Sequence, residues 1–144
     1  MMIDLKVKDF MTHQPPQITS TALLADAVST IESSDQDSAV VVDDNQVVGI
    51  LSERDCLKTL ISNSYYCDGA PHVSEFMKTS IKTVESEDNI LDLANNVVNG
   101  TSGFCDQTCF PVMQHGVFVG LIGVKGLVEA LNKYYKSCLH KATS

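Results

Sequence analysis

Seven consecutive residues in the first half of the chain combine side chains that suit a small polar ligand: Gly49-Ile50-Leu51-Ser52-Glu53-Arg54-Asp55. The Asp55 carboxylate can accept hydrogen bonds from both hydroxyls of a ribose, which would select a ribonucleoside. Ser52 stands where a helix is expected to begin, so its hydroxyl and the free backbone N–H groups could receive a phosphate, to which Arg54 would add positive charge. The same Ser-x-x-Asp pattern is also an ordinary helix start, with Ser52 as the N-cap and Asp55 favouring the helix dipole.

The cysteines and histidines offer weaker chemistry. Cys105 and Cys109, with His115 and either Cys67 or His72, could hold zinc, but their spacing is not that of a compact Cys-x₂-Cys knuckle. The same two cysteines could oxidise reversibly. Unreactive thiols are the simpler interpretation of these cysteines. The chain also has no recognisable nucleophile beside a base and no glycine-rich phosphate loop, so an enzyme is not expected. We therefore expect no metal site, no required cofactor and no enzymatic activity.

The composition is typical of a protein that binds neither nucleic acid nor membrane. The 144 residues carry a formal charge of −8, whereas a nucleic-acid surface needs clustered Lys and Arg. Residues 1–11 are too short and too often charged for a signal peptide. No apolar stretch approaches the roughly 20 residues that span a bilayer. With five cysteines, an odd number, and no signal peptide, we expect reduced thiols and a cytoplasmic location.

The chain contains an internal duplication. The segment Val7-Lys8-Asp9-Phe10-Met11 recurs 66 residues later as Val73-Ser74-Glu75-Phe76-Met77. Apolar residues then recur at spacings of three and four, over 23–31 in the first copy and 90–98 in the second, which predicts one helix in each. A hairpin of valine-rich strands follows in each copy, and then a second helix, from Asp55 to about Ser62 and from about Lys125 to Ser137.

Each copy thus has the order β-α-β-β-α, with a short first strand at Ile18-Thr19 or Lys82-Thr83-Val84. The predicted N-caps of the first helices are Ser20 or Thr21 and Ser86. About 60 residues make a thin core, so the copies should pack together with pseudo-two-fold symmetry. The predicted fold class is α/β in the broad sense of mixed helices and strands, and α+β in the narrower classification. Its predicted parts are 1–62 as the first repeat, 63–71 as the linker, 72–132 as the second repeat and 133–144 as the C-terminal helix end and tail.

In their order and duplication, these features resemble a tandem pair of CBS domains, or Bateman module, over residues 7–131. The resemblance rests on the Val-x-Asp-x-Met start, Ala27 and Ala94 in the helices, Pro111-Val112, and the run that ends at Asp55. The family binds AMP, ADP, ATP or S-adenosylmethionine in clefts between its repeats. Its ligand motif, Gly-h-x-(Ser/Thr)-x-x-Asp with h hydrophobic, matches the run from Gly49. The resemblance therefore implies ligand contacts from Ile50, Ser52, Arg54 and Asp55.

In the family, this motif faces the leading segment and the second-strand start of the other repeat. The resemblance thus implies that the base of the ligand lies against residues of the second copy, namely Val73, Phe76, Met77, Gln107, Thr108 and Phe110. Packing between the repeats would equally explain Phe76, Met77 and Phe110.

The second copy departs from the motif, because Gly123 and Gly126 replace the serine and the aspartate and cannot hold a ribose. The reciprocal cleft is expected to be empty or to bind something else. The resemblance assigns to it Val7, Phe10, Met11, Asp37 and Ser38.

Two hypotheses for the function follow. The first is a standalone regulatory module that binds one adenosine-containing ligand per chain and signals to an effector protein of unknown identity. The alternative is a ligand-free structural module that dimerises and docks a partner. The resemblance implies a homodimer formed through helices, and an apolar stripe between Leu127 and Cys138 on the last helix fits a packing role.

Overall fold

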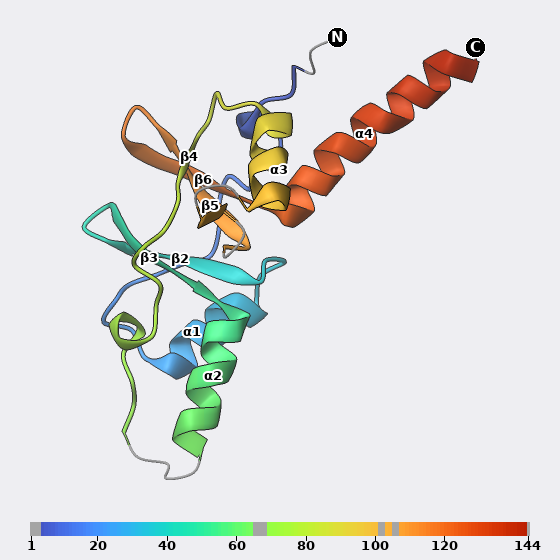
Figure 1. Ribbon diagram of the computed structural model, residues 1–144. Coiled ribbons are helices and arrows are strands. Elements are labelled where there is room, and N and C mark those ends of the chain that lie inside the picture. Colours follow the sequence, from blue (N-terminus) through green and yellow to red (C-terminus); the bar gives the residue numbers. More distant parts are fainter. Residues whose placement is uncertain (1–3, 65–68, 101–102, 105–106, 144) are drawn as a thin grey trace. The chain divides into compact units, whose positions relative to one another are not determined.

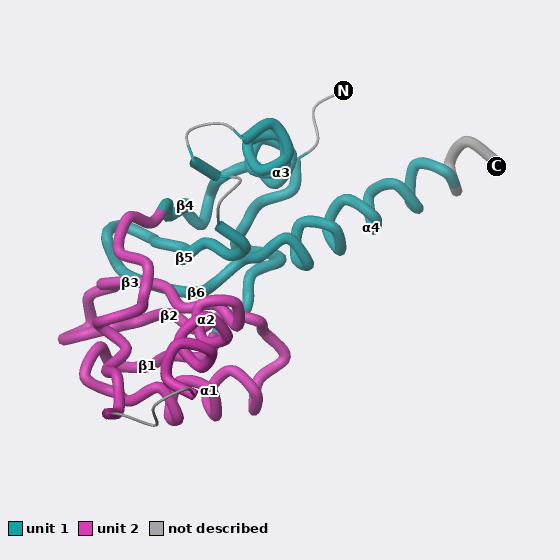
Figure 2. The backbone as a smooth tube through the Cα atoms, turned by 60° about the horizontal axis from the view of Figure 1, so that its bottom comes forward, with its two compact units in different colours: residues 1–13, 82–144 teal, residues 14–81 magenta. Residues whose placement is uncertain are grey.

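The computed structural model describes residues 4–64, 69–100, 103–104 and 107–143. It divides into two compact units, which Figure 2 shows in two colours. Unit 1 comprises residues 1–13 and 82–144, and unit 2 comprises residues 14–81. Within the described residues, no helix combines the length and the apolar character that crossing a bilayer requires.

Unit 2 contains a three-stranded sheet in the order β1-β2-β3. Strand β1 (Gln17–Ile18) runs parallel to β2 (Ser38–Asp43), which pairs antiparallel with β3 (Gln46–Ser52). A parallel pair needs a crossover connection, and α1 (Leu24–Glu32) provides it. Helix α2 (Glu53–Ser64) follows β3 directly and packs beside α1 (Figure 1).

Unit 1 repeats this arrangement with β4 (Val84–Glu85), β5 (Cys109–Gln114) and β6 (Val117–Gly123). Helix α3 (Ile90–Asn99) connects β4 to β5, and α4 (Val124–Thr143) follows β6. The predicted order β-α-β-β-α is confirmed in both copies, and the fold is of the α+β class.

The two hairpins share their local geometry. The two residues at each tip, Asp44-Asn45 and His115-Gly116, all have positive φ angles, as a type I′ turn requires. The register also shifts at matching places, between Val41 and Val42 and between Val112 and Met113. The turn chemistry therefore sets the same strand register twice.

The predicted N-caps were wrong. Helix α3 is capped by Asn89, whose Oδ1 accepts hydrogen bonds from the backbone N–H groups of Leu91 at 2.8 Å and Asp92 at 3.2 Å. Helix α1 begins at Leu24, where the Asp26 carboxylate accepts from the backbone N–H of Leu23 at 3.3 Å.

The serines predicted as caps have other partners. The backbone N–H of Ser20 donates to Asp43 Oδ1 at 3.0 Å, and its hydroxyl donates to Oδ2 at 2.5 Å. These two bonds lower the pKa of Asp43. Ser86 is buried and joins two segments, donating its N–H to the carbonyl of Met113 and accepting from the N–H of Lys8. Both serines serve contacts with residues distant in sequence, which a local pattern does not reveal.

Each unit takes its leading segment from the other copy. Val7, in the 3₁₀ turn Val7–Asp9, is fully buried in the core of unit 1. Val73, in the turn Val73–Glu75, is fully buried in the core of unit 2. Each leading segment therefore packs in the unit whose strands come from the other copy of the repeat.

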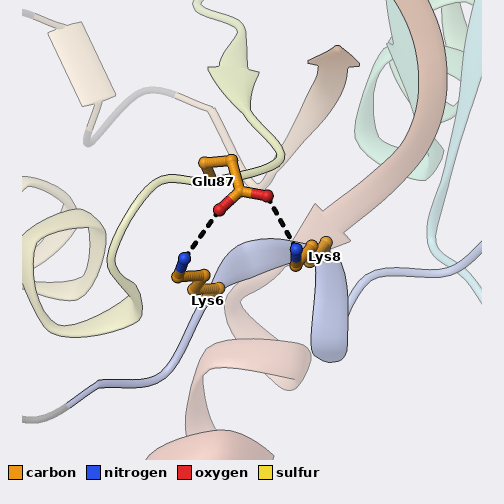
Figure 3. Close-up of polar contacts among 3 residues, drawn as sticks. All are labelled: Lys6, Lys8 and Glu87. Carbon is orange, nitrogen blue, oxygen red and sulfur yellow. Dashed lines mark hydrogen bonds and ion pairs between the residues drawn. The ribbon is translucent and has the colours of Figure 1, made fainter.

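An ion-pair cluster holds the leading segment of unit 1 (Figure 3). The Nζ atoms of Lys6 and Lys8 each lie 2.7 Å from a carboxylate oxygen of Glu87. Hydrogen bonds from the two ammonium groups lower the pKa of Glu87 to about 2, and the bond to Glu87 raises the pKa of Lys6. Because all three side chains are exposed, these ion pairs contribute little free energy, and they supplement the backbone hydrogen bonds of the leading segment.

Candidate functional site

The motif of the first copy lies at the junction between β3 and α2. Ser52 is the last residue of β3, and Asp55 lies in the first turn of α2. Oδ2 of Asp55 accepts hydrogen bonds from the backbone N–H and the hydroxyl of Ser52, both at 2.9 Å. Oγ of Ser52 accepts from the backbone N–H of Asp55 at 3.2 Å. These reciprocal bonds form a capping box, which fixes both side chains at the positive end of the helix dipole.

The capping box leaves groups available for a ligand. Ser52 and Asp55 are half-buried, and Arg54 is exposed. In the part of the chain that the structure describes, Oδ1 of Asp55 accepts no hydrogen bond and Arg54 forms no ion pair. An ionised carboxylate oxygen can accept from a hydroxyl pair, and a guanidinium can bind a phosphate. The junction can therefore offer both an acceptor and a positive charge.

The leading segment Val73–Lys78 covers the edge of β3 beside this junction. Ile50 and Lys78 exchange backbone hydrogen bonds of 3.0 and 2.9 Å, so the segment extends the sheet by one short bridge. A Cβ atom on Gly49 would lie 2.7 Å from Sδ of Met77 and 2.9 Å from the carbonyl oxygen of Lys78. Glycine at the first motif position thus allows the segment to approach the strand. Sequence reasoning missed Lys78, although its place directly after Met77 could have indicated it.

The predicted site residues of unit 2 lie in different surroundings. Ile50 is 4% exposed, and Val73 belongs to the core. Met77 is half-buried against Gly49. Phe76 is half-buried beside a small pocket of about 260 Å³, which it shares with Lys58, Thr59, Ser62, Pro71 and Glu75. The structure therefore brings these residues into one unit with Ser52 and Asp55.

The other three predicted residues belong to unit 1. Gln107 is 8% exposed, and its amide is occupied by backbone: Oε1 accepts from the N–H of Lys82, and Nε2 donates to the carbonyls of Lys82 and Cys109, each at 2.8 Å. Phe110 is fully buried in the core of unit 1, with its ring centroid 5.4 Å from that of Phe104. Thr108 is exposed, and its carbonyl accepts from the first residue of α4. Gln107 and Phe110 thus have clear structural roles.

At the junction between β6 and α4, backbone carbonyl oxygens lie close to the two glycines that replace the motif residues. A Cβ atom on Gly126 would lie 3.3 Å from the carbonyl oxygen of Phe10, and one on Gly123 would lie 3.2 Å from that of Thr108. A serine or an aspartate there would require the neighbouring backbone to shift by a few tenths of an ångström. The two junctions are therefore unequal in shape as well as in chemistry.

Two of the three described thiols are buried. Cys56 and Cys109 are buried, while Cys138 is exposed. Burial raises the pKa of Cys56, and the carboxylates of Asp55 and Glu53 raise it further, so its thiol stays protonated. The described residues contain no group of three His, Cys, Asp or Glu side chains that could hold a metal ion. Cys105, which the zinc hypothesis needs, and Cys67, which it offers as an alternative to His72, lie outside the described residues.

Comparisons with known proteins give the same picture of the fold. Residues 7–62 match the family model of the CBS domain. The protein AcuB of Vibrio cholerae, named for acetoin utilization, is 26% identical, with a TM-score of 0.78 over 94% of this chain and 97% of AcuB.

Two further solved structures are similar in fold at lower identity. The CBS-domain pair of MJ0100, solved with 5′-methylthioadenosine and S-adenosyl-L-methionine, is 17% identical, with a TM-score of 0.77 over 92% of this chain and 99% of that one. CBSX2 of Arabidopsis thaliana, solved with AMP, is 22% identical, with a TM-score of 0.72 over 90% and 98% of the two chains. Residues 7–62 thus match a CBS domain, and the chain as a whole has the fold of CBS-domain pairs.

Proposed function

We propose that this chain is a regulatory module that binds an adenosine-containing ligand at the β3–α2 junction of unit 2. The observation that carries the proposal is Oδ1 of Asp55, which accepts no hydrogen bond among the described residues, is held by the capping box with Ser52 and lies next to exposed Arg54. Asp55 would accept the ribose hydroxyls, and the α2 N-terminus and Arg54 would receive a phosphate. Ser52, whose N–H and hydroxyl both donate to Asp55, would orient that carboxylate toward the ligand. Ile50, Phe76 and Met77 would contact the base.

The ligand class is supported by the structures of similar fold. MJ0100 was solved with two adenosyl compounds and CBSX2 with AMP. AMP, ADP, ATP and S-adenosylmethionine are therefore the ligands to test first. Contacts from Gln107, Thr108 and Phe110 stay a prediction of the family resemblance, because these residues belong to unit 1.

The ligand would act by changing the arrangement of the chain that an effector protein recognises. It can do so only if it binds one arrangement of the chain more tightly than another. We further propose that the protein is a cytoplasmic homodimer that needs no cofactor and catalyses no reaction.

Thermal unfolding with and without AMP, ADP, ATP, S-adenosylmethionine and NAD tests the proposal. At 100 times its Kd, a ligand stabilises the folded state by about 2.7 kcal/mol, which raises the Tm by several degrees. Asp55→Ala should abolish this rise while itself lowering the Tm, because it also breaks the capping box. Asp26→Ala is the matched control, since Asp26 caps α1 in a similar way but lies outside the motif.

The site assignment fails if no adenosyl compound raises the Tm of the wild type, or if Asp55→Ala responds as the wild type does. The first result would favour a ligand-free dimerisation module. One observation favours that alternative: the capping box already gives Ser52 and Asp55 a structural role. It predicts a dimer whose Tm no nucleotide changes.

A further inference from the structure

Two methionines hold equivalent places in the two copies of the repeat. Met11 and Met77 lie 66 residues apart, each near the end of a leading segment. An ideal Cβ atom on Gly120 would lie 2.7 Å from Sδ and 3.1 Å from Cγ of Met11. One on Gly49 would lie at the same two distances from Met77. In each unit, therefore, a thioether fills the space that a side chain on the strand glycine would take.

Beside each methionine, a short backbone bridge joins the leading segment to its strand. In unit 1, the N–H groups of Thr12 and Leu121 donate to each other's carbonyls at 2.7 and 3.0 Å. In unit 2, those of Lys78 and Ile50 do the same at 2.9 and 3.0 Å. Both bridges lie outside the named strands, so the ladder bonds of a full strand do not support them. The packing of the thioether against its glycine therefore matters for keeping each bridge closed.

Backbone N–H groups around each sulfur already have acceptors. Besides the bridge bonds, the N–H of Met11 donates to the carbonyl of Val7 at 3.0 Å. The N–H of Met77 donates to the carbonyl of Val73 at 2.9 Å. A thioether suits such surroundings because it needs no hydrogen bond. An oxygen atom added to the sulfur would find these donors in use, and it would be satisfied by turning out into water.

Both sulfur-bearing side chains are partly open to solvent. Met11 and Met77 are half-buried, and each packs at the edge of the core of its unit. Met113 of β5 is also half-buried but belongs to neither leading segment. A small oxidant can reach a half-buried sulfur, and sulfoxide formation makes a flexible apolar side chain polar. Oxidation would thus remove the apolar group that fits against the glycine.

We propose that Met11 and Met77 are modification sites at which a hydroperoxide releases the leading segment from its strand. The sulfur attacks the terminal peroxide oxygen, so an S–O bond forms and the O–O bond breaks. The sulfur loses two electrons, and the leaving oxygen takes the proton of the transferred one and departs as an alcohol, or as water from hydrogen peroxide. Each sulfoxide then turns toward water, leaves its glycine and opens the adjacent bridge. The proposal concerns the chain without ligand, so it stands or fails independently of the nucleotide site.

Treatment of the full chain with hydrogen peroxide tests the proposal. Peptide mass spectrometry identifies the methionines that gain one oxygen atom, with free methionine as the reference for reactivity. Met11→Leu and Met77→Leu replace the thioether by an apolar side chain of similar volume, so the untreated variants should fold as the wild type does. Met113→Leu is the matched control, because it removes a half-buried methionine outside the leading segments.

Thermal unfolding measures the loss of stability. Peroxide should lower the Tm of the wild type and of Met113→Leu by about 5 °C or more, because a polar group is forced out of a packed contact. The double variant Met11→Leu/Met77→Leu should keep its Tm after the same treatment. Oxidation of thiols affects all the variants alike, so it cancels in this comparison. Reduction by the two stereospecific methionine sulfoxide reductases should restore the wild-type Tm.

Hydrogen exchange locates the change in the structure. After oxidation of the wild type, the amide of Lys78 should exchange about 10-fold faster or more. The amide of Val40 should keep its protection, because it donates to the carbonyl of Pro16 elsewhere in unit 2. In Met77→Leu only the bridge at Thr12 should open, and in Met11→Leu only the bridge at Lys78.

Three results would overturn the proposal. The first is that Met11 and Met77 stay unoxidised at peroxide doses that fully convert free methionine. The second is that both become sulfoxides while the Tm and the exchange of the bridge amides stay unchanged. The third is that the double variant loses as much stability as the wild type, which would place the damage elsewhere in the chain.

Discussion

At the scale of single residues, Ser52 and Asp55 show how one local pattern can serve two purposes. Their mutual hydrogen bonds start α2, and the remaining oxygen of Asp55 is what a ribose would need. A capping role therefore leaves a ligand role possible, because the capping bonds use Oδ2 of Asp55 and a ribose would use Oδ1. The double role also explains why Asp55→Ala needs Asp26→Ala as a control for lost capping.

Glu87 supports a prediction about pH at the same scale. Its pKa falls from 4.5 to about 2 in the folded chain because Lys6 and Lys8 donate to it. The stabilisation is present above pH 4.5 and is lost as the pH falls towards 2. Glu87→Gln should therefore lower the Tm slightly at pH 7, and the difference from wild type should disappear near pH 2.

Thermal melts across this pH range check the prediction, with Glu85→Gln as the control. Glu85 is also exposed, but the described residues contain no ion pair to it. The effect of Glu87→Gln should shrink as salt is added, since all three charges are exposed. A Tm difference that persists unchanged at pH 2 would show that the cluster does not stabilise the fold electrostatically.

At the scale of elements, the contact between each leading segment and its strand depends on a glycine. In unit 1, a Cβ atom on Gly120 of β6 would lie 2.7 Å from Sδ of Met11 and 2.8 Å from the carbonyl oxygen of Thr12. In unit 2, Gly49 makes the equivalent approach to Met77 and Lys78. Glycine matters here because of the space that a side chain would occupy, and not because of an unusual backbone angle.

Gly120→Ala should therefore destabilise the protein by about 1–3 kcal/mol, measured by urea unfolding. A methionine side chain can move aside, but the carbonyl of Thr12 is held by its bond from the N–H of Leu121. Adding Met11→Ala should thus recover only part of the loss. Gly123→Ala, whose Cβ would lie 3.2 Å from the nearest atom, should cost less. Wild-type stability in Gly120→Ala would contradict this account of the contact.

At the scale of the whole molecule, the sequence repeats and the compact units do not coincide. Val7 belongs to the first repeat but to the core of unit 1, whose strands come from the second repeat. Val73 belongs to the second repeat but to the core of unit 2. Val7 and Val73 hold equivalent positions 66 residues apart, and each completes a core whose strands come from the other copy.

Val7→Ala and Val73→Ala form a matched pair that tests this exchange by hydrogen exchange. Each removes two methyl groups from a fully buried site, at a cost of roughly 2 kcal/mol. Val7→Ala should reduce the protection of Leu121 in β6 more than that of Ile50 in β3, and Val73→Ala should do the reverse. Equal losses in both units, or the opposite order, would count against the division into these units.

The sequence by itself determined the duplication, the element order and the location of the ligand motif. These features depend on local signals: apolar spacing defined α1 and α3, and short polar turns defined the hairpins at Asp44-Asn45 and His115-Gly116. The motif could be located because its residues are consecutive. The capping bond between Ser52 and Asp55 was foreseen for the same reason.

Only the tertiary structure decided which distant residues meet. It gave Ser20 to Asp43 and Ser86 to Met113, so neither caps a helix. It also hydrogen-bonds the side-chain amide of Gln107 to the backbone of Lys82 and Cys109. A hydrogen bond or a buried methyl group is satisfied by whichever partner the folded chain brings near, and the sequence pattern around one residue does not contain that information.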